Sequence, residues 1–389
     1  MRKDWEYKKL GEVGTIITGS TPSTKDNSNY LPQEYCFVKP SDLIEQGICK
    51  ITKTEFYLSK KGFSISRALP IGSVLVSCIG SIGKIGVLTK EACSNQQINA
   101  IIPSNNIDSF YLAYVLCGIK YKLEEIANAP VVPIINKTAF SKVIIPIPPK
   151  PTQLAIVAEL DKINELIQLK KEQLKDYDQL AQSIFYEMFG DPVENEKGWE
   201  VKNIESVCSS IVRGPFGSAL KKDFFVPKNN STYKIYEQKN AIQKNASIGS
   251  YYITEERFKE LSRFELLPGD IIMSCSGTIG ELYRIPVNAE KGIMNQALLK
   301  FSLLKQINFL YFLYLMDYVK KEFTIRGSGL QNIGSVKIIK SMKFGLPPLP
   351  LQQQFAARIE AIERQKQQVS ETIKDLETLL ASRMQYWFD

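Results

Sequence analysis

The sequence contains no histidine, and this absence restricts the chemistry open to the chain. Histidine is the general base of Ser-His-Asp and Cys-His catalysis, and it is the commonest protein ligand of transition metals. All such sites are therefore excluded. An enzymatic site in this chain would have to use carboxylates, lysine, tyrosine or cysteine.

Cysteine and long apolar runs are also scarce. The seven cysteines are odd in number and include no C-x-x-C pair, so neither a disulfide framework nor a zinc site is expected, and a reducing cytoplasm fits better. The strongest apolar run, residues 309–316, is far shorter than the ~20 residues that span a bilayer. The first residues lack the apolar stretch of a signal peptide. We expect a cytoplasmic protein with no membrane partner.

The 389 residues suffice for two to three domains, and the net charge of +8 suits a polyanionic partner without proving one. An internal repeat organises the chain. Segments of the first half match segments of the second in the same order: 5–10 with 199–204, 69–83 with 267–280, 95–96 with 295–296, and 148–153 with 347–352. Residues 20–67 show no clear match to residues 214–265. A duplicated scaffold with unlike middles indicates two binding sites of different specificity, whereas plain drift after duplication would blur the shared segments too.

Each half begins with β-branched and aromatic segments separated by turn residues, which predict short strands. A proline-rich segment follows, and then a stretch without internal glycine or proline, 152–189 and 351–388, which predicts a long helix. The predicted fold is α+β, with two similar mixed α/β domains and a pair of long antiparallel helices in a pseudo-twofold arrangement. The expected boundaries are 1–150 and 194–347 for the domains, and 151–193 and 348–389 for the helices.

Both long segments carry an apolar stripe whose spacing alternates between four and three residues. An unbroken repeat of this kind favours knobs-into-holes pairing of two helices, each about 57 Å long at about 1.5 Å per residue. Lys170 and Lys366 interrupt the stripe as register or surface features, and separate packing of each helix on its own domain is the weaker alternative. The residues expected to pair the helices are Ile156, Leu160, Ile163, Ile167, Leu174, Tyr177, Ile184, Met188, Phe355, Ile359, Ile362, Val369, Ile373, Leu376, Leu380 and Trp387.

Further apolar residues lie near the ends of these helices. Phe185, Phe189, Met384 and Phe388 are candidates for docking a partner protein, since docking needs an exposed apolar patch. Off-stripe residues such as Leu180, Phe185 and Phe189 would equally serve to cover the globular domains.

These features resemble the specificity subunits of type I restriction-modification systems. The resemblance rests on the Trp5 and Trp199 openings, Gly19-Ser20-Thr21-Pro22-Ser23, the LPxG-to-SCxGxxG segments, the Asn-Gln pairs, the Pro-Pro-x-Pro-x-Gln helix starts and the tail at 182–192. It covers essentially the whole chain.

The resemblance implies two target-recognition domains that each read half of a split double-stranded DNA target with an unread spacer. It also implies assembly with two copies of an adenine-specific DNA methyltransferase subunit and, optionally, with ATP-dependent restriction subunits. The unlike middles of the two halves predict an asymmetric target, and the paired helices would fix its spacer.

Basic, hydroxyl and amide residues are the candidates for DNA contact. In the first domain they are Ser20, Thr21, Ser23, Thr24, Lys25 and Lys39; in the second they are Arg213, Lys221, Lys222, Tyr236, Gln238 and Lys239. The loop at 214–217 is expected to present Arg213 and Lys221. The duplicated turns add Ser81, Lys84, Ser276 and Thr278, and the duplicated pairs Asn95-Gln96 and Asn295-Gln296 would hold a shared loop or contact phosphate.

The sequence offers only incomplete or weak matches to catalytic motifs. Residues 80–84 lack the first glycine and the Ser/Thr of a phosphate loop, so a tight turn is expected there. No Asn/Asp-Pro-Pro-aromatic loop of a methyltransferase is present. Asp223, Glu237 and Lys239 match the pattern of some metal-dependent nucleases, but the pattern is short and unrepeated. We therefore expect a non-catalytic DNA-binding subunit without metal or cofactor; the alternatives are a coiled-coil scaffold that binds proteins and, less favoured, a nuclease.

Overall fold

The computed structural model describes residues 4–45, 47–127, 132–326 and 336–388. The chain divides into two compact units, Met1–Glu172 with Ser370–Asp389, and Gln173–Val369. Each unit therefore combines one globular part with segments of both long helices. No helix in the described ranges has the length and hydropathy needed to span a bilayer.

The first unit contains three sheets. A five-stranded sheet has the order β2-β9-β6-β7-β4, a three-stranded sheet has the order β5-β3-β8, and β1 pairs antiparallel with β10. These strands are β1 Glu6–Lys9, β2 Gly14–Thr18, β3 Tyr35–Val38, β4 Ile48–Ile51, β5 Phe56–Leu58, β6 Val74–Ser77, β7 Ile85–Leu88, β8 Ala92–Ser94, β9 Ile98–Pro103 and β10 Ile144–Ile147. The helices are α1 Leu10–Val13, α2 Lys60–Ile65, α3 Ser109–Gly118, α4 Lys120–Ile126 and α5 Lys137–Ser141.

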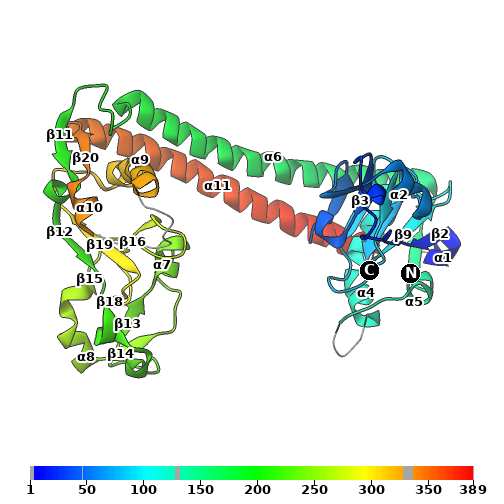
Figure 1. The fold of residues 1–389 in the computed structure, drawn as a ribbon, viewed down its shortest axis with the longest axis horizontal. Helices are drawn as coiled ribbons and strands as arrows, with labels where there is room; N and C mark the ends of the chain where they lie inside the picture. The colour runs from blue at the N-terminus through cyan, green and yellow to red at the C-terminus, as the bar shows by residue number, and fades with distance from the viewer. Residues whose placement is uncertain (1–3, 46, 128–131, 327–335, 389) are drawn as a thin grey trace. The chain divides into compact units, whose positions relative to one another are not determined.

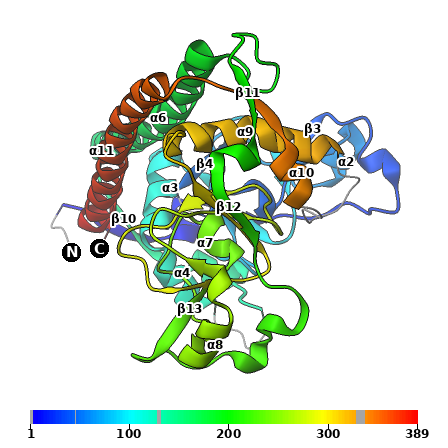
Figure 2. The same ribbon diagram turned by 90° about the vertical axis from the view of Figure 1, so that its left-hand side faces the viewer.

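The second unit repeats much of this plan. The sheet β12-β19-β16-β17 has the order of β2-β9-β6-β7, and β13 pairs parallel with β18 as β3 does with β8. The strands are β11 Glu200–Asn203, β12 Cys208–Arg213, β13 Thr232–Tyr236, β14 Tyr252–Thr254, β15 Glu265–Leu266, β16 Ile271–Ser274, β17 Leu282–Arg284, β18 Gly292–Met294, β19 Leu298–Leu303 and β20 Lys343–Leu346. The helices are α7 Gln238–Ile242, α8 Glu255–Glu260, α9 Phe309–Arg326 and α10 Val336–Ser341. Figure 2 turns this unit toward the viewer, with α8 at one end and α9 and α10 toward the other.

Short 3-10 helices connect several of these elements. In the first unit one precedes β3 and one follows it; in the second they follow β11 and β12 and precede β15. They are Asn27–Asn29, Pro40–Asp42, Ile204–Val207, Gly217–Leu220, Lys222–Phe224 and Ser262–Phe264.

The central strands are buried over their whole length. All four residues of β6, β7 and β16 are buried. This explains why these strands read as continuous apolar runs rather than as alternating patterns, since both faces of each sheet are covered. On the first unit α3 packs against β6 and β7, and it buries Tyr111 through Leu116.

The long helices are α6, Lys150–Phe189, and α11, Leu349–Phe388 (Figure 1). In the first unit they meet through Glu159 with Arg383 and through Lys171 with Glu377, whose Nζ and Oε1 lie 2.8 Å apart. In the second unit they meet through Asp178 with Lys366, at 2.7 Å, and through Phe185 with Phe355. In each unit the residue number rises on one helix as it falls on the other, so the segments pair antiparallel. The predicted fold class is confirmed.

The apolar stripe lies on the inner faces of these helices. Nine of its predicted positions are buried, and the remaining ones are half-buried. The buried ones are Ile156, Leu160, Ile163, Ile167, Phe355, Ile359, Ile362, Val369 and Ile373, and the half-buried ones are Leu174, Tyr177, Ile184, Met188, Leu376, Leu380 and Trp387. Lys366, which interrupts the stripe, is held by Asp178 and Glu363 at 2.7 and 3.0 Å.

The helix ends correct one prediction. Phe388 is buried in the core of the first unit, where Met384 packs partly buried against the same core. Phe185 and Phe189 are fully buried in the core of the second unit, stacked among Tyr311, Tyr314 and Phe355. The docking prediction is wrong for these three phenylalanines, because the globular domains already cover their side chains.

Candidate nucleic-acid interface

The first candidate reading loop begins at Gly19, directly after β2. The Gly19 amide donates to the Ile98 carbonyl at 3.0 Å, and the Ser20 amide donates to the Ser94 carbonyl at 2.9 Å. A Cβ atom on Gly19 would lie 2.2 Å from the Asn95 carbonyl oxygen. Only glycine permits this approach of one backbone to another.

The second loop leaves β12 in the same way. The Gly214 amide donates to the Leu298 carbonyl at 3.0 Å, and a Cβ atom there would lie 1.8 Å from the Asn295 carbonyl oxygen. Two loops that share little sequence beyond this glycine are therefore anchored to the same feature of the scaffold.

That feature is the duplicated Asn-Gln pair. Asn95 Oδ1 accepts from the Gln97 amide at 3.1 Å, and Asn295 Oδ1 accepts from the Ala297 amide at 3.0 Å, so each asparagine shapes a local turn. Thr21 Oγ1 donates to Gln96 Oε1 at 2.6 Å, and Arg213 Nε donates to the Gln296 carbonyl at 3.1 Å. The pairs thus hold the two candidate reading loops, which is one of the two roles expected for them.

The first-domain candidates cluster on this loop. Thr21, Ser23, Thr24 and Lys25 are exposed, and Ser20 is half-buried. The loop is tied to α2 beyond them, since Lys61 Nζ lies 2.9 Å from Asp26 Oδ2. Hydrogen bonds from Ser28 and Lys61 lower the pKa of Asp26 to about 2, so this tie persists well into acid.

Lys39 lies apart from that loop, after β3. Its side chain is half-buried, with Nζ 3.1 Å from the centre of the Phe56 ring. The cation is stacked on an aromatic face, which fixes its position but leaves part of it accessible.

In the second domain the structure separates the candidates. Lys221 and Lys222 are exposed, whereas Arg213, Gln238 and Lys239 are half-buried. Tyr236 is fully buried, its hydroxyl donates to the Glu290 carbonyl at 2.6 Å, and burial raises its pKa. The prediction that Tyr236 contacts DNA is wrong, because its side chain belongs to the domain core.

The duplicated Gly-rich segments are tight turns between adjacent strands, as predicted. Ser77 Oγ donates to the Ser81 carbonyl and accepts from the Lys84 amide at 2.9 Å. Ser274 makes the same two bonds with Thr278 and with the Glu281 amide, the latter at 3.0 Å. Gly83 and Gly280 have φ of 75° and 86°, which explains the glycines. Ser81 and Thr278 are exposed and Ser276 is half-buried, while Lys84 is 14% exposed and paired with Glu45 at 2.5 Å.

The acidic pattern considered for a nuclease is already occupied by other contacts. Glu237 Oε2 lies 2.7 Å from Lys239 Nζ, and the Glu237 amide donates to Asn240 Oδ1 at 2.8 Å. Within the described ranges no three His, Cys, Asp or Glu residues are placed to hold a metal ion.

A basic groove lies beside the second reading loop and was missed by the sequence reasoning. It has a volume of about 540 Å³, and its lining includes Arg213, Phe216, Arg263 and Lys340 above an apolar floor. Arg263 belongs to the unmatched segment 214–265, so its position and charge could have identified it as a candidate for DNA contact. Lys340 lies far along the sequence, and only folding brings it here.

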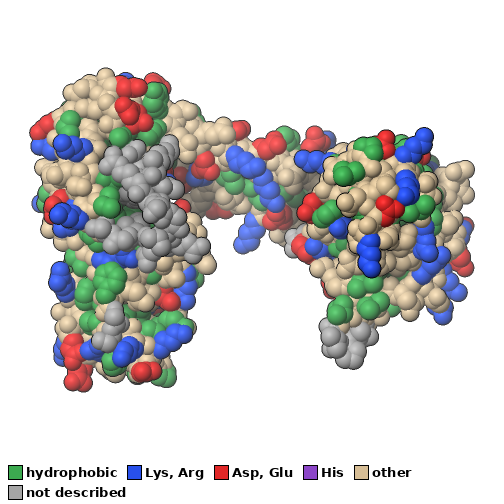
Figure 3. All heavy atoms as spheres, in the orientation of Figure 1, with side chains coloured by type: hydrophobic (Ala, Val, Ile, Leu, Met, Phe, Trp, Pro, Cys, Tyr) green, Lys and Arg blue, Asp and Glu red, His purple; other side chains and the backbone are tan. Residues whose placement is uncertain are grey.

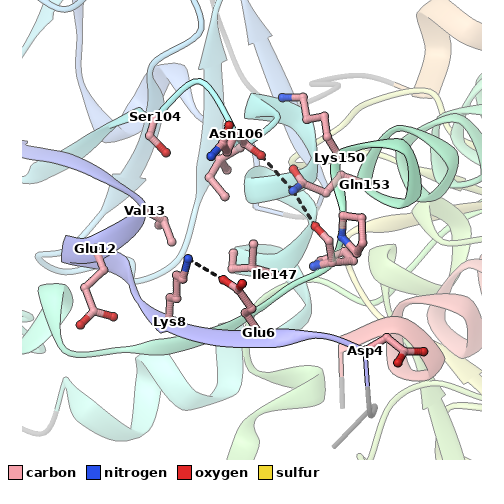
Figure 4. Close-up of a pocket in the computed structure, with 13 residues that line it drawn as sticks. Asp4, Glu6, Lys8, Glu12, Val13, Ser104, Asn106, Ile147, Lys150 and Gln153 are labelled. Carbon is pink, nitrogen blue, oxygen red and sulfur yellow. Dashed lines mark hydrogen bonds and ion pairs between the residues drawn. The ribbon is translucent and has the colours of Figure 1, made fainter.

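The Pro-Pro-x-Pro-x-Gln motif has a structural role, shown in Figure 4 for the first domain. Gln153 Nε2 donates to the Asn106 and Pro148 carbonyls at 3.1 and 2.9 Å, and its Oε1 accepts from the Asp108 amide at 2.9 Å. Gln352 likewise accepts from the Asn308 amide at 2.7 Å and donates to the Pro347 carbonyl at 2.8 Å. The buried glutamine anchors the start of each long helix. The nearby cavity of about 470 Å³ is lined by charges of both signs, including Glu6, Lys8 and Lys150.

These observations define a class of protein that contains two similar domains and two long helices. The two domains carry different polar loops at equivalent places. A family model described as "Type I restriction modification DNA specificity domain" matches residues 2–176 and again residues 196–378. The chain belongs to this family and contains its domain twice, so the predicted family is confirmed.

Individual relatives agree with this assignment. The MjaIX type I restriction enzyme specificity subunit of Methanocaldococcus jannaschii is 25% identical over 384 residues, covering 92% of this chain and 87% of the relative. The HindI specificity subunit of Haemophilus influenzae is 28% identical over 207 residues, covering 52% of this chain and 40% of the relative.

Two solved structures share the fold. One, from work on complex assembly and conformational transition of the type I R-M system, has a TM-score of 0.69 at 18% identity and covers 100% of this chain and 98% of its own. The other, a type I S subunit from M. genitalium, has a TM-score of 0.52 at 13% identity, with coverage of 99% and 96%.

Proposed function

We propose that this chain is the non-catalytic specificity subunit of a cytoplasmic type I restriction-modification complex. It recognises an asymmetric bipartite sequence in double-stranded DNA with a fixed spacer, and it recruits two copies of an adenine-specific methyltransferase subunit together with ATP-dependent restriction subunits. The observation that carries the proposal is the pair of equivalent loops, anchored alike at Gly19 and Gly214 but unlike in most of the side chains that follow.

The loops supply the chemistry of base reading. The first presents mainly hydroxyl groups and Lys25, whereas the second is bordered by Arg213, Lys221 and Lys222. Hydroxyl groups contact either phosphates or base edges, and arginine and lysine favour guanine edges and phosphates. Unlike side chains on like scaffolds read unlike half-sites, which makes the target asymmetric.

The long helices supply the spacer. The antiparallel pairing of α6 and α11 within each unit, through contacts such as Phe185 with Phe355 and Lys171 with Glu377, supports this role. A fixed separation of two readers corresponds to a fixed number of base pairs between half-sites. Partner methyltransferases would flip the target adenine out of the duplex for methyl transfer.

The test is methylation in the presence of a partner. The chain is co-expressed with the methyltransferase subunit of its own system, and methylated adenines are mapped across the host genome. We expect one split motif, and replacement of residues 20–67 by the corresponding segment of a relative should change only one of its halves. Methylation that ignores sequence, or that needs no specificity chain, would contradict the proposal and favour a protein-binding scaffold.

Nuclease activity is tested separately with the purified chain, DNA and magnesium. We expect no cleavage, and Glu237→Ala protein should support the same methylation as the wild type if its fold is intact. Cleavage that disappears in the Glu237→Ala variant would instead establish the metal-dependent nuclease.

A further inference from the structure

Phe216 is a large aromatic side chain held on the surface next to the second reading loop. It is 66% exposed, and the guanidinium carbon of Arg213 lies 5.3 Å from its ring centre. A single exposed apolar side chain is common on protein surfaces, so the meaning of this one comes from the charged groove beside it. Its position on the rim of the basic groove makes it a candidate for contact with the same ligand.

The backbone beneath Phe216 is well anchored. The Gly214 amide donates a hydrogen bond to the Leu298 carbonyl at 3.0 Å, and Arg213 Nε donates one to the Gln296 carbonyl at 3.1 Å. Pro215 is buried. Proline further restricts the backbone, since its ring fixes φ. The ring is therefore presented at a defined place, with little ordering left to occur when a ligand binds.

The surroundings select duplex DNA as that ligand. Arg213, Arg263 and Lys340 contribute positive charge around the groove, with Lys340 Nζ also 2.8 Å from Glu205. Its apolar lining includes Val212, Phe264 and Val336. Guanidinium groups suit phosphates, and an aromatic face suits a base. An acidic apolar peptide has related chemistry, but the groove is continuous with the loop proposed to read DNA.

The first domain has no such side chain at the equivalent place. Counting from the anchoring glycines, Phe216 corresponds to Thr21, whose hydroxyl is bonded to Gln96 at 2.6 Å. Ser20, Thr21 and Ser23 carry no ring that could stack on a base. The two domains therefore offer DNA different contacts at one shared position of the scaffold.

We propose that Phe216 inserts between two adjacent base pairs at the second half-site, with Arg213 and Arg263 contacting the flanking phosphates. Apolar wedges of this kind unstack a base step and kink the duplex. The second half-site would then contain a step that unstacks readily, such as a pyrimidine–purine step. The inference rests on the proposed function, since it assumes that the second domain reads DNA.

The test uses the complex of the full chain with its methyltransferase subunit, on the motif mapped by methylation. Duplexes carry 2-aminopurine at successive positions through the second half-site, and its fluorescence rises when the base unstacks. We expect a rise at one step with wild-type protein, its loss in Phe216→Ala, and its retention in Phe216→Trp. Affinity of Phe216→Ala for the target should fall about 10- to 100-fold. Phe224→Ala is the matched control, as Phe224 is 37% exposed in the same domain with Arg257 at 4.3 Å, and it should behave as wild type.

The outcomes separate this inference from the proposed function. Site-specific methylation with the same 2-aminopurine signal in wild type and Phe216→Ala overturns the wedge and leaves the specificity function intact. Failure of Phe216→Ala to bind the methyltransferase subunit, seen by size-exclusion chromatography, also overturns it, because Phe216 would then be a protein contact. Absence of any sequence preference in the wild-type complex contradicts both.

Discussion

The two repeats of this chain agree in backbone and differ in side chains. Both approach the scaffold through a glycine, both use an Asn-Gln turn to hold the loop, and both bury a glutamine at the start of a long helix. Beyond the glycine, hydroxyl residues stand in the first loop where proline and phenylalanine stand in the second. The parts that the two repeats share are those that a backbone needs to pack, and the parts that differ are those that we propose to meet DNA.

The comparison also shows one place where the scaffolds differ. In the second unit the connector after α6 covers the sheet edge: the Gly345 amide donates to the Pro192 carbonyl at 2.8 Å, and Trp199 Nε1 donates to the Phe189 carbonyl at 3.1 Å. In the first unit the corresponding face carries a groove of about 690 Å³ whose lining includes Trp5 and Trp387, stacked with ring centres 6.2 Å apart. Among the described residues, the same scaffold position is thus covered by chain in the second repeat and hollowed by a groove in the first.

The largest effects on stability should come from substitutions at the helix ends. These substitutions test whether both long helices contribute side chains to the core of each unit. Phe388→Ala should destabilise the first unit, and Phe189→Ala the second, by about 3–5 kcal/mol each, since each ring is buried in that unit's core. The rate of hydrogen exchange, measured peptide by peptide, should rise in the unit whose core contains the substituted ring. Leu180→Ala, at a side chain 47% exposed, is the control. Faster exchange confined to the opposite unit would contradict the division of the core described above.

The anchoring glycines give the next largest effect and sharpen the comparison of the loops. Gly19→Ala places a methyl group against the Asn95 carbonyl and should displace the first loop, at a cost of about 1–3 kcal/mol. Gly214→Ala should do the same to the second loop. Mapped methylation should lose selectivity in one half-site for each variant and in the opposite halves for the two. Equal losses in both halves would mean that the loops do not read separately.

The helix-start glutamines should have an effect at least as large on the free energy of unfolding, but without the loss of selectivity in one half-site. Gln153→Ala leaves the Asp108 amide and two carbonyls without a partner, and Gln352→Ala leaves the Asn308 amide and the Pro347 carbonyl. A buried unpaired polar group costs about 1–3 kcal/mol. Denaturant unfolding should therefore place Gln153→Ala at or below Gln352→Ala in stability. A lower stability of Gln352→Ala than of Gln153→Ala would show that the number of lost hydrogen bonds does not determine the loss of stability.

The smallest effect concerns pH and the contact of α6 with α11 in the first unit. Hydrogen bonding from Arg383 lowers the pKa of Glu159 below its ordinary value of 4.5. A carboxylate with a lowered folded-state pKa stabilises the fold above the unfolded-state pKa, and this contribution disappears as pH falls through the lowered value. Glu159→Gln should therefore cost up to about 1 kcal/mol at pH 7 and progressively less as the pH falls through the lowered pKa, in melts at low salt. A difference from wild type that is as large at pH 3 as at pH 7 would exclude the ion pair as its cause.

Much of the fold follows from the sequence because its signals are local and duplicated. The four-three spacing in α6 and α11 identifies the paired faces, and the duplicated glycines at Gly83 and Gly280 identify the hairpin turns. The errors arise where burial is decided far away in the sequence. Phe185 looks like a surface residue beside the stripe, yet Tyr311 and Phe355 enclose it.

The site was less predictable for the same reason. Tyr236 is a plausible reader by composition, but β13 is buried at both Tyr236 and Lys234 because sheet and helices cover it. Arg263 and Lys340 reach Phe216 only through the fold. Residue type and variability indicate which segment meets DNA, whereas which side chains of that segment face outward depends on non-local packing.

The tight contact of Gly19 with the Asn95 carbonyl has a consequence for gene shuffling. The contact stands at the border where the unmatched segment begins, and it involves only main-chain atoms of the loop. A foreign segment that brings a leading glycine, together with strands able to pair with β7 and β8, can be seated on the existing framework. New DNA preferences would then be acquired by exchanging this stretch of coding sequence, while the long helices stay as they are.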